Sequence, residues 1–110
     1  MPKYDKKGRP DFERVRCADG FNMSVQASHS NYSSPRNNTG PWDSVEIGFP
    51  SAYELCLMPC AEDSDRPTET IYGYVPNILV RSVIEAHGGL VSGEVPPIPF
   101  VKETENNNRE

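Results

Sequence analysis

Long apolar segments are absent from this sequence of 110 residues, and cysteine is scarce. No run approaches the roughly 20 apolar residues that a membrane-spanning helix needs. The opening residues, MPKYDKKGRPDF, are positively charged, but the apolar core of a secretory signal does not follow them. The three cysteines are an odd number, which favours reduced thiols over a disulfide framework. We therefore expect no membrane association and a cytoplasmic location.

Basic side chains are few outside the start of the chain. Residues 1–16 hold six of the eleven Lys and Arg residues, whereas the other 94 residues carry a net charge of −8. A protein that binds the phosphate backbone of DNA or RNA needs a basic face. We therefore expect no direct binding of nucleic acid by the body of the protein.

Motifs of common catalytic and cofactor sites are also missing. The chain has no P-loop and no GxGxxG, and neighbouring carboxylates occur only in the polar segment 62–65. The remaining candidates for a zinc site or a thiol nucleophile are Cys17, Cys56, Cys60, His29 and His87. Zinc sites usually combine two closely spaced ligand pairs, and only one loose cysteine pair is present here. We expect no metal, no cofactor and no enzymatic activity.

Length and composition predict one small α+β domain. Residues 1–11 are expected to form a flexible basic N-terminus, and residues 12–91 the folded domain. Residues 92–110 are expected to form a Pro-rich extended segment and a disordered polar tail. Within the domain we expect an antiparallel β-sheet of about four strands with one main helix packed on it.

The first two strands are predicted as a β-hairpin over residues 13–28. Apolar and polar side chains alternate over Phe21–Ser28, which is typical of a half-buried strand. Val15 and Cys17 alternate with arginines before it. The dipeptide Asp19-Gly20 between the two segments is typical of a two-residue type I′ turn.

Two further strands and one helix follow from the same kind of pattern. A strand over 42–49 would place Val45, Ile47 and Phe49 on one face, and a strand over 71–75 would place Tyr72 and Tyr74 opposite Ile71 and Val75. A helix over 76–87 would start at Pro76, present Leu79, Val80, Val83, Ile84 and His87 on one stripe, and stop at Gly88-Gly89. Residues 52–60 predict a short helical turn or a buried irregular piece stopped by Pro59, and residues 61–70 an acidic surface loop.

The polar segment 28–42, SHSNYSSPRNNTGPW, is the best candidate for a binding site. The candidate ligand-binding residues are Tyr32, Ser33, Arg36, Asn37 and Trp42. A guanidinium suits phosphate or carboxylate, and an aromatic ring can stack on a base. These parts fit a small nucleotide site and also a protein-binding loop. The remaining alternative is structural: Arg36 pairs with the acidic body, and Trp42 anchors the loop to the core.

The string DGFNMSVQASHSNYSSPRNNTGPWDSVEIGFPS, from Asp19 to Ser51, resembles small uncharacterised proteins of tailed bacteriophages. The segments that carry the resemblance are DGFxxSVQAS, YxxPR, GP and VExGFPS, followed by YGYVP at Tyr72–Pro76 and HGG at His87–Gly89. The resemblance implies a phage-encoded protein, and small non-enzymatic proteins in that setting often counter bacterial immunity.

The resemblance favours a non-enzymatic inhibitor of a bacterial defence system. The leading hypothesis is sequestration of a small or cyclic nucleotide signal by the 28–42 loop, across the interface of a homo-oligomer in the host cytoplasm. One alternative is an inhibitor that binds a host defence protein, such as an anti-CRISPR that meets a basic effector surface through the loop or the acidic segment. Another is a minor structural or assembly protein of the virion.

Overall fold

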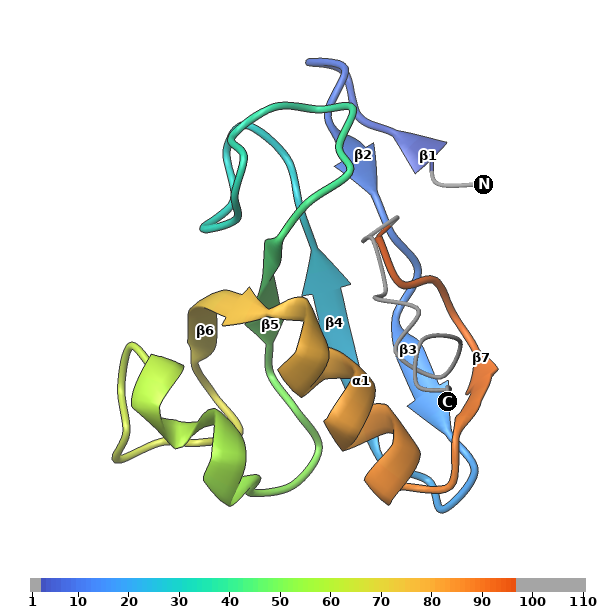
Figure 1. The fold of residues 1–110 in the computed structure, drawn as a ribbon, viewed down its shortest axis with the longest axis vertical. Coiled ribbons are helices and arrows are strands. Elements are labelled where there is room, and N and C mark those ends of the chain that lie inside the picture. Colours follow the sequence, from blue (N-terminus) through green and yellow to red (C-terminus); the bar gives the residue numbers. More distant parts are fainter. Residues whose placement is uncertain (1–2, 97–110) are drawn as a thin grey trace, which may run out of the picture.

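The computed structural model describes residues 3–96, and Figure 1 shows their fold. In chain order the elements are β1 (Lys3–Tyr4), β2 (Pro10–Asp11), β3 (Val15–Cys17), β4 (Asn22–Gln26), β5 (Ser44–Gly48), the 3₁₀ helix η1 (Leu55–Cys60), β6 (Ile71–Pro76), α1 (Asn77–Ala86) and β7 (Leu90–Ser92). The tail predicted for residues 97–110 lies outside the described residues.

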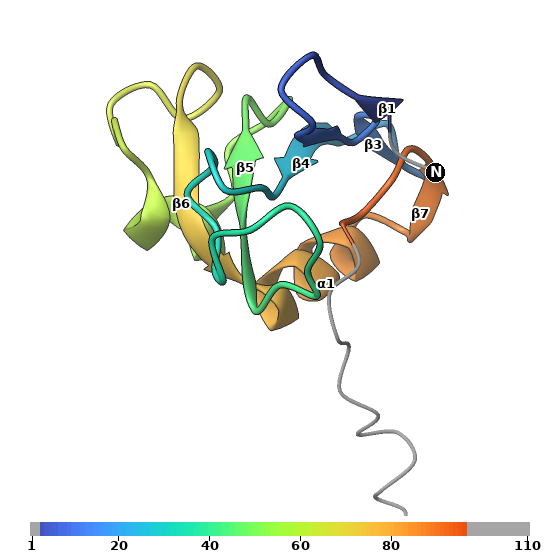
Figure 2. The same cartoon turned by 90° about the horizontal axis from the view of Figure 1, so that it is seen from above.

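Five strands form one antiparallel sheet in the order β6-β5-β4-β3-β7. Helix α1 connects the two edge strands and lies against one face of the sheet (Figure 2). The predicted small α+β domain with an antiparallel sheet and one main helix is therefore confirmed. The sheet has five strands rather than about four. The sequence did not predict β7, because its three residues are too few to show an alternating pattern.

The predicted hairpin of β3 and β4 is present, but its turn differs from the prediction. Gly20 N–H donates to the Cys17 carbonyl (3.0 Å) and Cys17 N–H to the Phe21 carbonyl (2.8 Å), which closes a three-residue loop. Gly20 has φ +98°, whereas Asp19 has no positive φ, so the type I′ turn is wrong. The Asp19 side chain accepts a hydrogen bond from Phe21 N–H (2.9 Å), which favours the turn observed.

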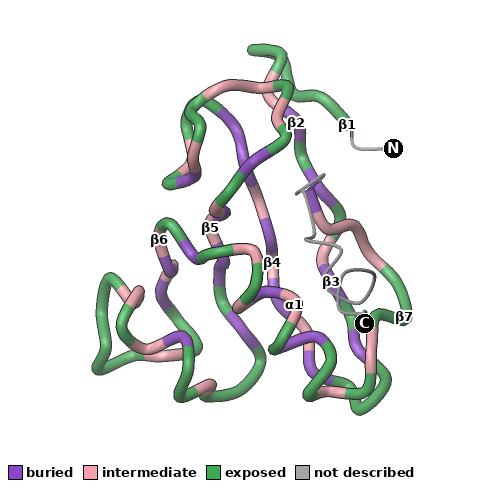
Figure 3. The backbone as a smooth tube through the Cα atoms, viewed as in Figure 1, coloured by how far each residue is buried: buried purple, intermediate pink, exposed green. Residues whose placement is uncertain are grey.

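The core lies between the sheet and α1, where the purple segments of Figure 3 gather. Alternate residues of β4 and β5 supply its centre, and the helix contributes one apolar stripe. The buried apolar residues are Phe12, Val15, Cys17, Phe21, Met23, Val25, Ala27, Trp42, Val45, Ile47, Leu57, Tyr72, Val75, Val80, Val83 and Ile84. Each predicted inward position of the first hairpin is therefore confirmed.

Strand β6 departs from simple alternation. Its register against β5 shifts so that Val75 lies opposite Val45 and Tyr72 opposite Ile47, which places two residues of β6 against one of β5. This β-bulge sends both Tyr72 and Val75 into the core and leaves Tyr74 exposed. The prediction that Tyr72 and Tyr74 share one face is therefore wrong.

Phe49 is a second departure from the predicted alternation. Its backbone has φ +50°, in the left-handed region, and its side chain is 51% exposed rather than directed inward with Ile47. Phe49 N–H still donates to the Thr70 carbonyl (3.0 Å), in register with the last pair of β5 and β6, and the Phe49 carbonyl accepts from Arg14 Nη2. Pro50 follows and prevents the strand from continuing.

Helix α1 ends as its sequence predicts. Gly88 N–H donates to the Glu85 carbonyl (3.1 Å) and Gly89 N–H to the Ile84 carbonyl (2.9 Å), which is the Schellman pattern. Both glycines have positive φ, at +91° and +97°. The turn that follows delivers the chain to β7, alongside β3.

Two shorter segments complete the described fold. Within the predicted N-terminal segment, β1 and β2 pair as a small hairpin. Of the two alternatives predicted over 52–60, the structure has the short helix, η1. It is not stopped by Pro59, which lies inside it, and of its residues only Leu57 is buried. The loop after η1 is exposed over most of its length, as predicted from its acidic sequence.

The two edges of the sheet differ. The outer side of β6 is engaged by the chain itself: Tyr74 N–H donates to the Tyr32 carbonyl (2.9 Å), Glu62 N–H to the Ile71 carbonyl (2.9 Å), and Ala61 forms a bridge with Tyr72. At the other edge all three residues of β7 are exposed. Among residues 3–96, no strand pairs with the outer side of β7.

Gly93 lies just after β7 and packs closely against the backbone of Arg14. Gly93 and Gly89 have nearly equal φ, +96° and +97°, but a Cβ at Gly93 would overlap the Arg14 carbonyl, whereas one at Gly89 would meet open space. We expect Gly93→Ala to lower the free energy of unfolding by about 1–3 kcal/mol more than Gly89→Ala does. Urea unfolding of both variants measures this difference, and equal losses would contradict the packing described.

Candidate functional site

The 28–42 loop is ordered by hydrogen bonds among its own residues. Ser33 is buried, and its hydroxyl donates to the Ser28 carbonyl (3.0 Å) and accepts from Ser28 N–H (3.2 Å). The Asn37 side chain accepts from Gly40 N–H (2.8 Å) and Thr39 N–H (3.1 Å). Ser33 and Asn37 thus use their polar side chains to fix the shape of the loop.

Trp42 attaches the end of the loop to the core. Its side chain is 1% exposed, and its indole N–H donates to the Asn37 carbonyl (3.2 Å). The ring meets Phe12 edge-to-face, with centroids 6.1 Å apart. Of the alternatives that the sequence left open for Trp42, this geometry supports the structural anchor, because neither face of a buried ring is available to a ligand.

Tyr32 and Arg36 meet at the surface with a third residue, Tyr74. The rings of Tyr32 and Tyr74 are tilted by 36° with centroids 5.9 Å apart. Arg36 donates to the Tyr74 hydroxyl (3.4 Å) and to the His29 carbonyl (3.3 Å), so it does not pair with a carboxylate among residues 3–96. All three side chains are exposed. This arrangement joins two aromatic rings and one cation in one surface cluster.

The bulge in β6 creates this cluster. Tyr74 has φ +52°, a left-handed conformation that costs a non-glycine residue about 1–2 kcal/mol. Gly73 permits the approach of the loop, because a Cβ there would lie 3.1 Å from Tyr32 Cβ. Tyr32 is held in place by its own N–H, which donates to the Glu46 carboxylate (2.8 Å). The loop therefore docks on β6 through backbone groups and leaves the rings at the surface.

An open cleft of about 370 Å³ adjoins the two tyrosines. Its lining consists of Tyr32, Pro59, Cys60, Ala61, Glu62, Gly73 and Tyr74. The lining residues other than Tyr32, Gly73 and Tyr74 come from the end of η1 and the start of the acidic loop. Partial burial raises the pKa of the Cys60 thiol, so this cysteine is mainly protonated at neutral pH.

The five residues predicted for ligand binding divide between two places. Tyr32 and Arg36 both contact Tyr74 at the surface, whereas Ser33, Asn37 and Trp42 are directed to the loop and core. Tyr74 was missed, because the alternating pattern of its segment gives no sign of the bulge that exposes it. The adjacent glycine, Gly73, is the one local signal, since a glycine inside a strand often marks a bulge or a close backbone approach.

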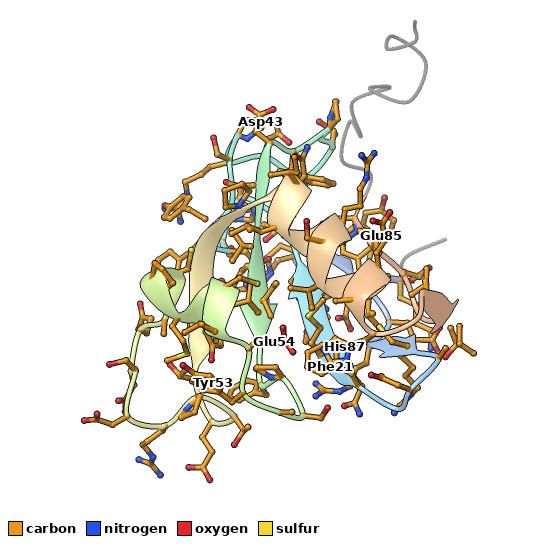
Figure 4. The ribbon with its side chains drawn as sticks, turned by 60° about the horizontal axis from the view of Figure 1, so that its bottom comes forward. Phe21, Asp43, Tyr53, Glu54, Glu85 and His87 are labelled. Carbon is orange, nitrogen blue, oxygen red and sulfur yellow. The ribbon has the colours of Figure 1, made fainter. Side chains whose placement is uncertain are left out.

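A second cluster of polar side chains lies at the C-terminal end of α1. His87 Nδ1 lies 2.6 Å from Asp19 Oδ2, and Nε2 lies 2.6 Å from Glu54 Oε2. The ring also stacks on Phe21, with centroids 4.0 Å apart and planes 7° apart. Figure 4 shows Phe21, Glu54 and His87 close together near the end of the helix. The cluster connects the first hairpin, the segment before η1 and α1.

The geometry implies that His87 is an imidazolium. Ionised carboxylates only accept hydrogen bonds, so both ring nitrogens must donate. The hydrogen bond to Asp19, supported by the contact with Glu54, raises the pKa of His87 above its ordinary value of 6.5, against the opposing effect of partial burial. The hydrogen bonds from Phe21 N–H and then from His87 lower the pKa of Asp19. With both nitrogens engaged, His87 joins three elements and has no free nitrogen to act as a base.

The structure also brings together short segments that lie far apart in the sequence. Asp19 and Phe21 of DGF contact His87 of HGG, and a Cβ on Gly88 would lie 2.9 Å from Ala18 Cβ. Tyr32 and Arg36 of YxxPR contact Tyr74 of YGYVP. DGF and HGG thus meet at the end of α1, and YxxPR and YGYVP meet beside the cleft.

Comparison of the chain with protein-family models, with curated proteins and with solved structures finds no match. Within residues 3–96, no His, Cys, Asp and Glu side chains gather in a group of three or more that could hold a metal ion. The same part of the chain contains no helix with the length and apolar character needed to cross a membrane.

The His87 cluster predicts a stability that changes with pH in both directions. Because the pKa of His87 is raised on folding, its stabilisation is complete below about pH 6.5 and is lost as pH rises through the folded pKa. Because the pKa of Asp19 is lowered, its contribution is present above about pH 3.9 and is lost as pH falls through the folded pKa. Urea unfolding from pH 3 to 9 should therefore show the greatest stability between these limits.

Substitution of His87 tests whether the imidazole causes the loss of stability expected at alkaline pH. We expect His87→Gln to be less stable than the wild type at pH 5.5, with a smaller difference at pH 8.5. Glu85→Gln serves as the control, because this carboxylate lies on the same helix and does not contact the imidazole. A His87→Gln difference that stays constant from pH 5.5 to 8.5 would show that the imidazole is not charged in the folded protein.

Proposed function

We propose that this protein is a non-enzymatic binding protein that takes a small nucleotide at the cleft beside Tyr32, Arg36 and Tyr74. The observation that carries the proposal is the position of an exposed guanidinium next to a pair of exposed tyrosine rings at a cleft of about 370 Å³. A cation, aromatic faces and a concave surface are the elements that a nucleotide requires.

Each part of a nucleotide has a suitable partner in this cluster. Arg36 makes only long hydrogen bonds, of 3.3 and 3.4 Å, so it can exchange them for shorter, charge-assisted bonds to a phosphate. The tyrosine rings offer faces on which a base can stack, an interaction worth about 1–3 kcal/mol per base. The fixed backbone of the 28–42 loop keeps these groups in place before the ligand arrives, which lowers the entropic cost of binding.

The phage resemblance supplies the biological setting of the proposal. A protein that binds a nucleotide without a catalytic apparatus lowers the concentration of free ligand. In an infected bacterium this activity would silence a defence system that signals through a small or cyclic nucleotide. Sequestration of this nucleotide in the host cytoplasm is therefore the role that we propose.

A protein target is the second candidate. The exposed acidic loop after η1 carries Glu62, Asp63, Asp65 and Glu69 at the surface. This surface favours a partner with a basic face, such as an effector that binds nucleic acid. Association of this kind weakens as salt rises, because solvent-exposed charges are screened. It would require no small-molecule ligand at the tyrosine cleft.

Thermal shifts with GMP, AMP and cyclic GMP test the proposed function. A ligand at a hundredfold excess over its Kd adds about 2.7 kcal/mol of stability, which raises Tm by roughly 10 °C or more in a domain of this size. We expect such a shift in the wild type and its loss in Arg36→Ala. Arg66→Ala is the control, because Arg66 pairs with Glu69 away from the cleft and its removal should leave the shift unchanged. A shift that persists in Arg36→Ala, or its absence with every nucleotide, would contradict the proposal.

Cysteine footprinting locates the ligand independently. Cys60 lines the cleft, whereas Cys56 is exposed one turn earlier in η1 and does not line it. Saturating nucleotide should slow alkylation of Cys60 by iodoacetamide at least fivefold and leave the rate at Cys56 unchanged. Both thiols have a raised pKa, so the reaction is run near pH 9 and followed by peptide mass spectrometry. Equal rates at Cys60 with and without ligand would place the binding site elsewhere.

A further inference from the structure

Glu62 contributes a carboxylate to the lining of the cleft. Its backbone is fixed against β6, because Glu62 N–H donates to the Ile71 carbonyl (2.9 Å) and the preceding residue forms a bridge with Tyr72. The side chain is exposed, and no hydrogen bond or ion pair to it is formed by any other residue from 3 to 96. The carboxylate is therefore available to accept hydrogen bonds from a ligand.

The surface cluster and the adjoining cleft together thus offer three different kinds of contact. Arg36 only donates hydrogen bonds, the tyrosine pair provides ring faces, and Glu62 only accepts. A ligand that satisfies all three has an anionic group, a planar ring and an edge with N–H donors. A nucleotide of any base meets the first two conditions, so the carboxylate is the group that distinguishes one base from another.

Guanine has the edge that best complements a carboxylate. Its N1–H and its 2-amino group lie side by side and can donate to the two carboxylate oxygens together. Adenine and cytosine present an acceptor nitrogen beside the amino group, and uracil presents a single N–H between two carbonyls. An acceptor facing a carboxylate is repelled and left without a hydrogen bond. Resting on the nucleotide site proposed above, we propose that Glu62 makes the cleft selective for guanine nucleotides.

The expected selectivity is moderate. A bidentate contact between a side chain and a base edge discriminates by about 1–3 kcal/mol, or roughly 5- to 150-fold in affinity. The cleft is open and Glu62 is exposed, so water competes for both hydrogen bonds. We therefore expect a preference for guanine over adenine near the lower end of this range, about tenfold.

Isothermal titration with GMP, IMP and AMP tests this proposal. IMP keeps N1–H but lacks the 2-amino group, so it removes one of the two hydrogen bonds without changing the phosphate or the sugar. We expect the wild type to bind GMP about tenfold more tightly than AMP, with IMP between them. In Glu62→Gln the ratio of the GMP and AMP affinities should fall to about one. Asp65→Asn removes an equal charge from the same loop but not from the cleft lining, and should keep the wild-type ratio.

The outcomes separate this proposal from the proposed function. Binding of all three nucleotides with one affinity, or a GMP preference that Glu62→Gln retains, would overturn the role of Glu62 and leave the nucleotide site intact. An equal loss of preference in Asp65→Asn would show a general charge effect and would also overturn it. If none of the three nucleotides binds the wild type, both the nucleotide site and its selectivity are overturned.

Discussion

The bulge in β6 is the constraint on which the core and the cleft both depend. Tyr72 and Val75 are three residues apart, so in a regular strand without the bulge they would lie on opposite faces, and one of them would leave the core. The left-handed backbone of Tyr74 costs about 1–2 kcal/mol. Burial of the Tyr72 side chain is worth about 2–3 kcal/mol, and its hydroxyl donates to the Pro67 carbonyl at 2.6 Å. The conformation that completes the core also places Tyr74 beside Tyr32 at the surface, so the cleft follows from the packing.

The His87 cluster fixes the start of η1, the end of this helix that lies away from the cleft. Glu54, which contacts the imidazole, immediately precedes this short helix, whereas Cys60 at its end lines the cleft. A 3₁₀ helix has weak internal hydrogen bonds, so its position depends on what holds its two ends. One end is joined to α1 and the first hairpin by charge, and the other to β6 by the bridge between Ala61 and Tyr72. The cleft wall is therefore supported by two separate parts of the fold.

The parts of the structure that the sequence predicted are those set by regular periodicity or by glycine. The alternation of Phe21, Met23, Val25 and Ala27 placed β4 correctly, and Gly88-Gly89 gave the end of α1. The departures at Phe49 and Tyr74 arise from left-handed residues that are not glycine. The alternating pattern marks neither of them, and Gly73 is the one local signal, for Tyr74 alone. Only some residues of the candidate site could be predicted from the sequence. Tyr32 and Arg36 belong to a visibly polar loop, whereas Tyr74 and Glu62 reach it only through the folded arrangement of β6.

The unequal edges of the sheet limit how copies of this protein can assemble through strand pairing. The chain's own segments engage the outer side of β6, so a strand from another molecule has no open ladder there. Within residues 3–96, the five-stranded sheet can therefore pair with another molecule only at its β7 edge. Once two β7 strands lie side by side, both ends of the combined ten-stranded sheet are closed. Such an assembly has a two-fold axis and stops at two molecules. The same contacts that position Tyr32 thus also prevent the five-stranded sheet from growing through its β6 edge.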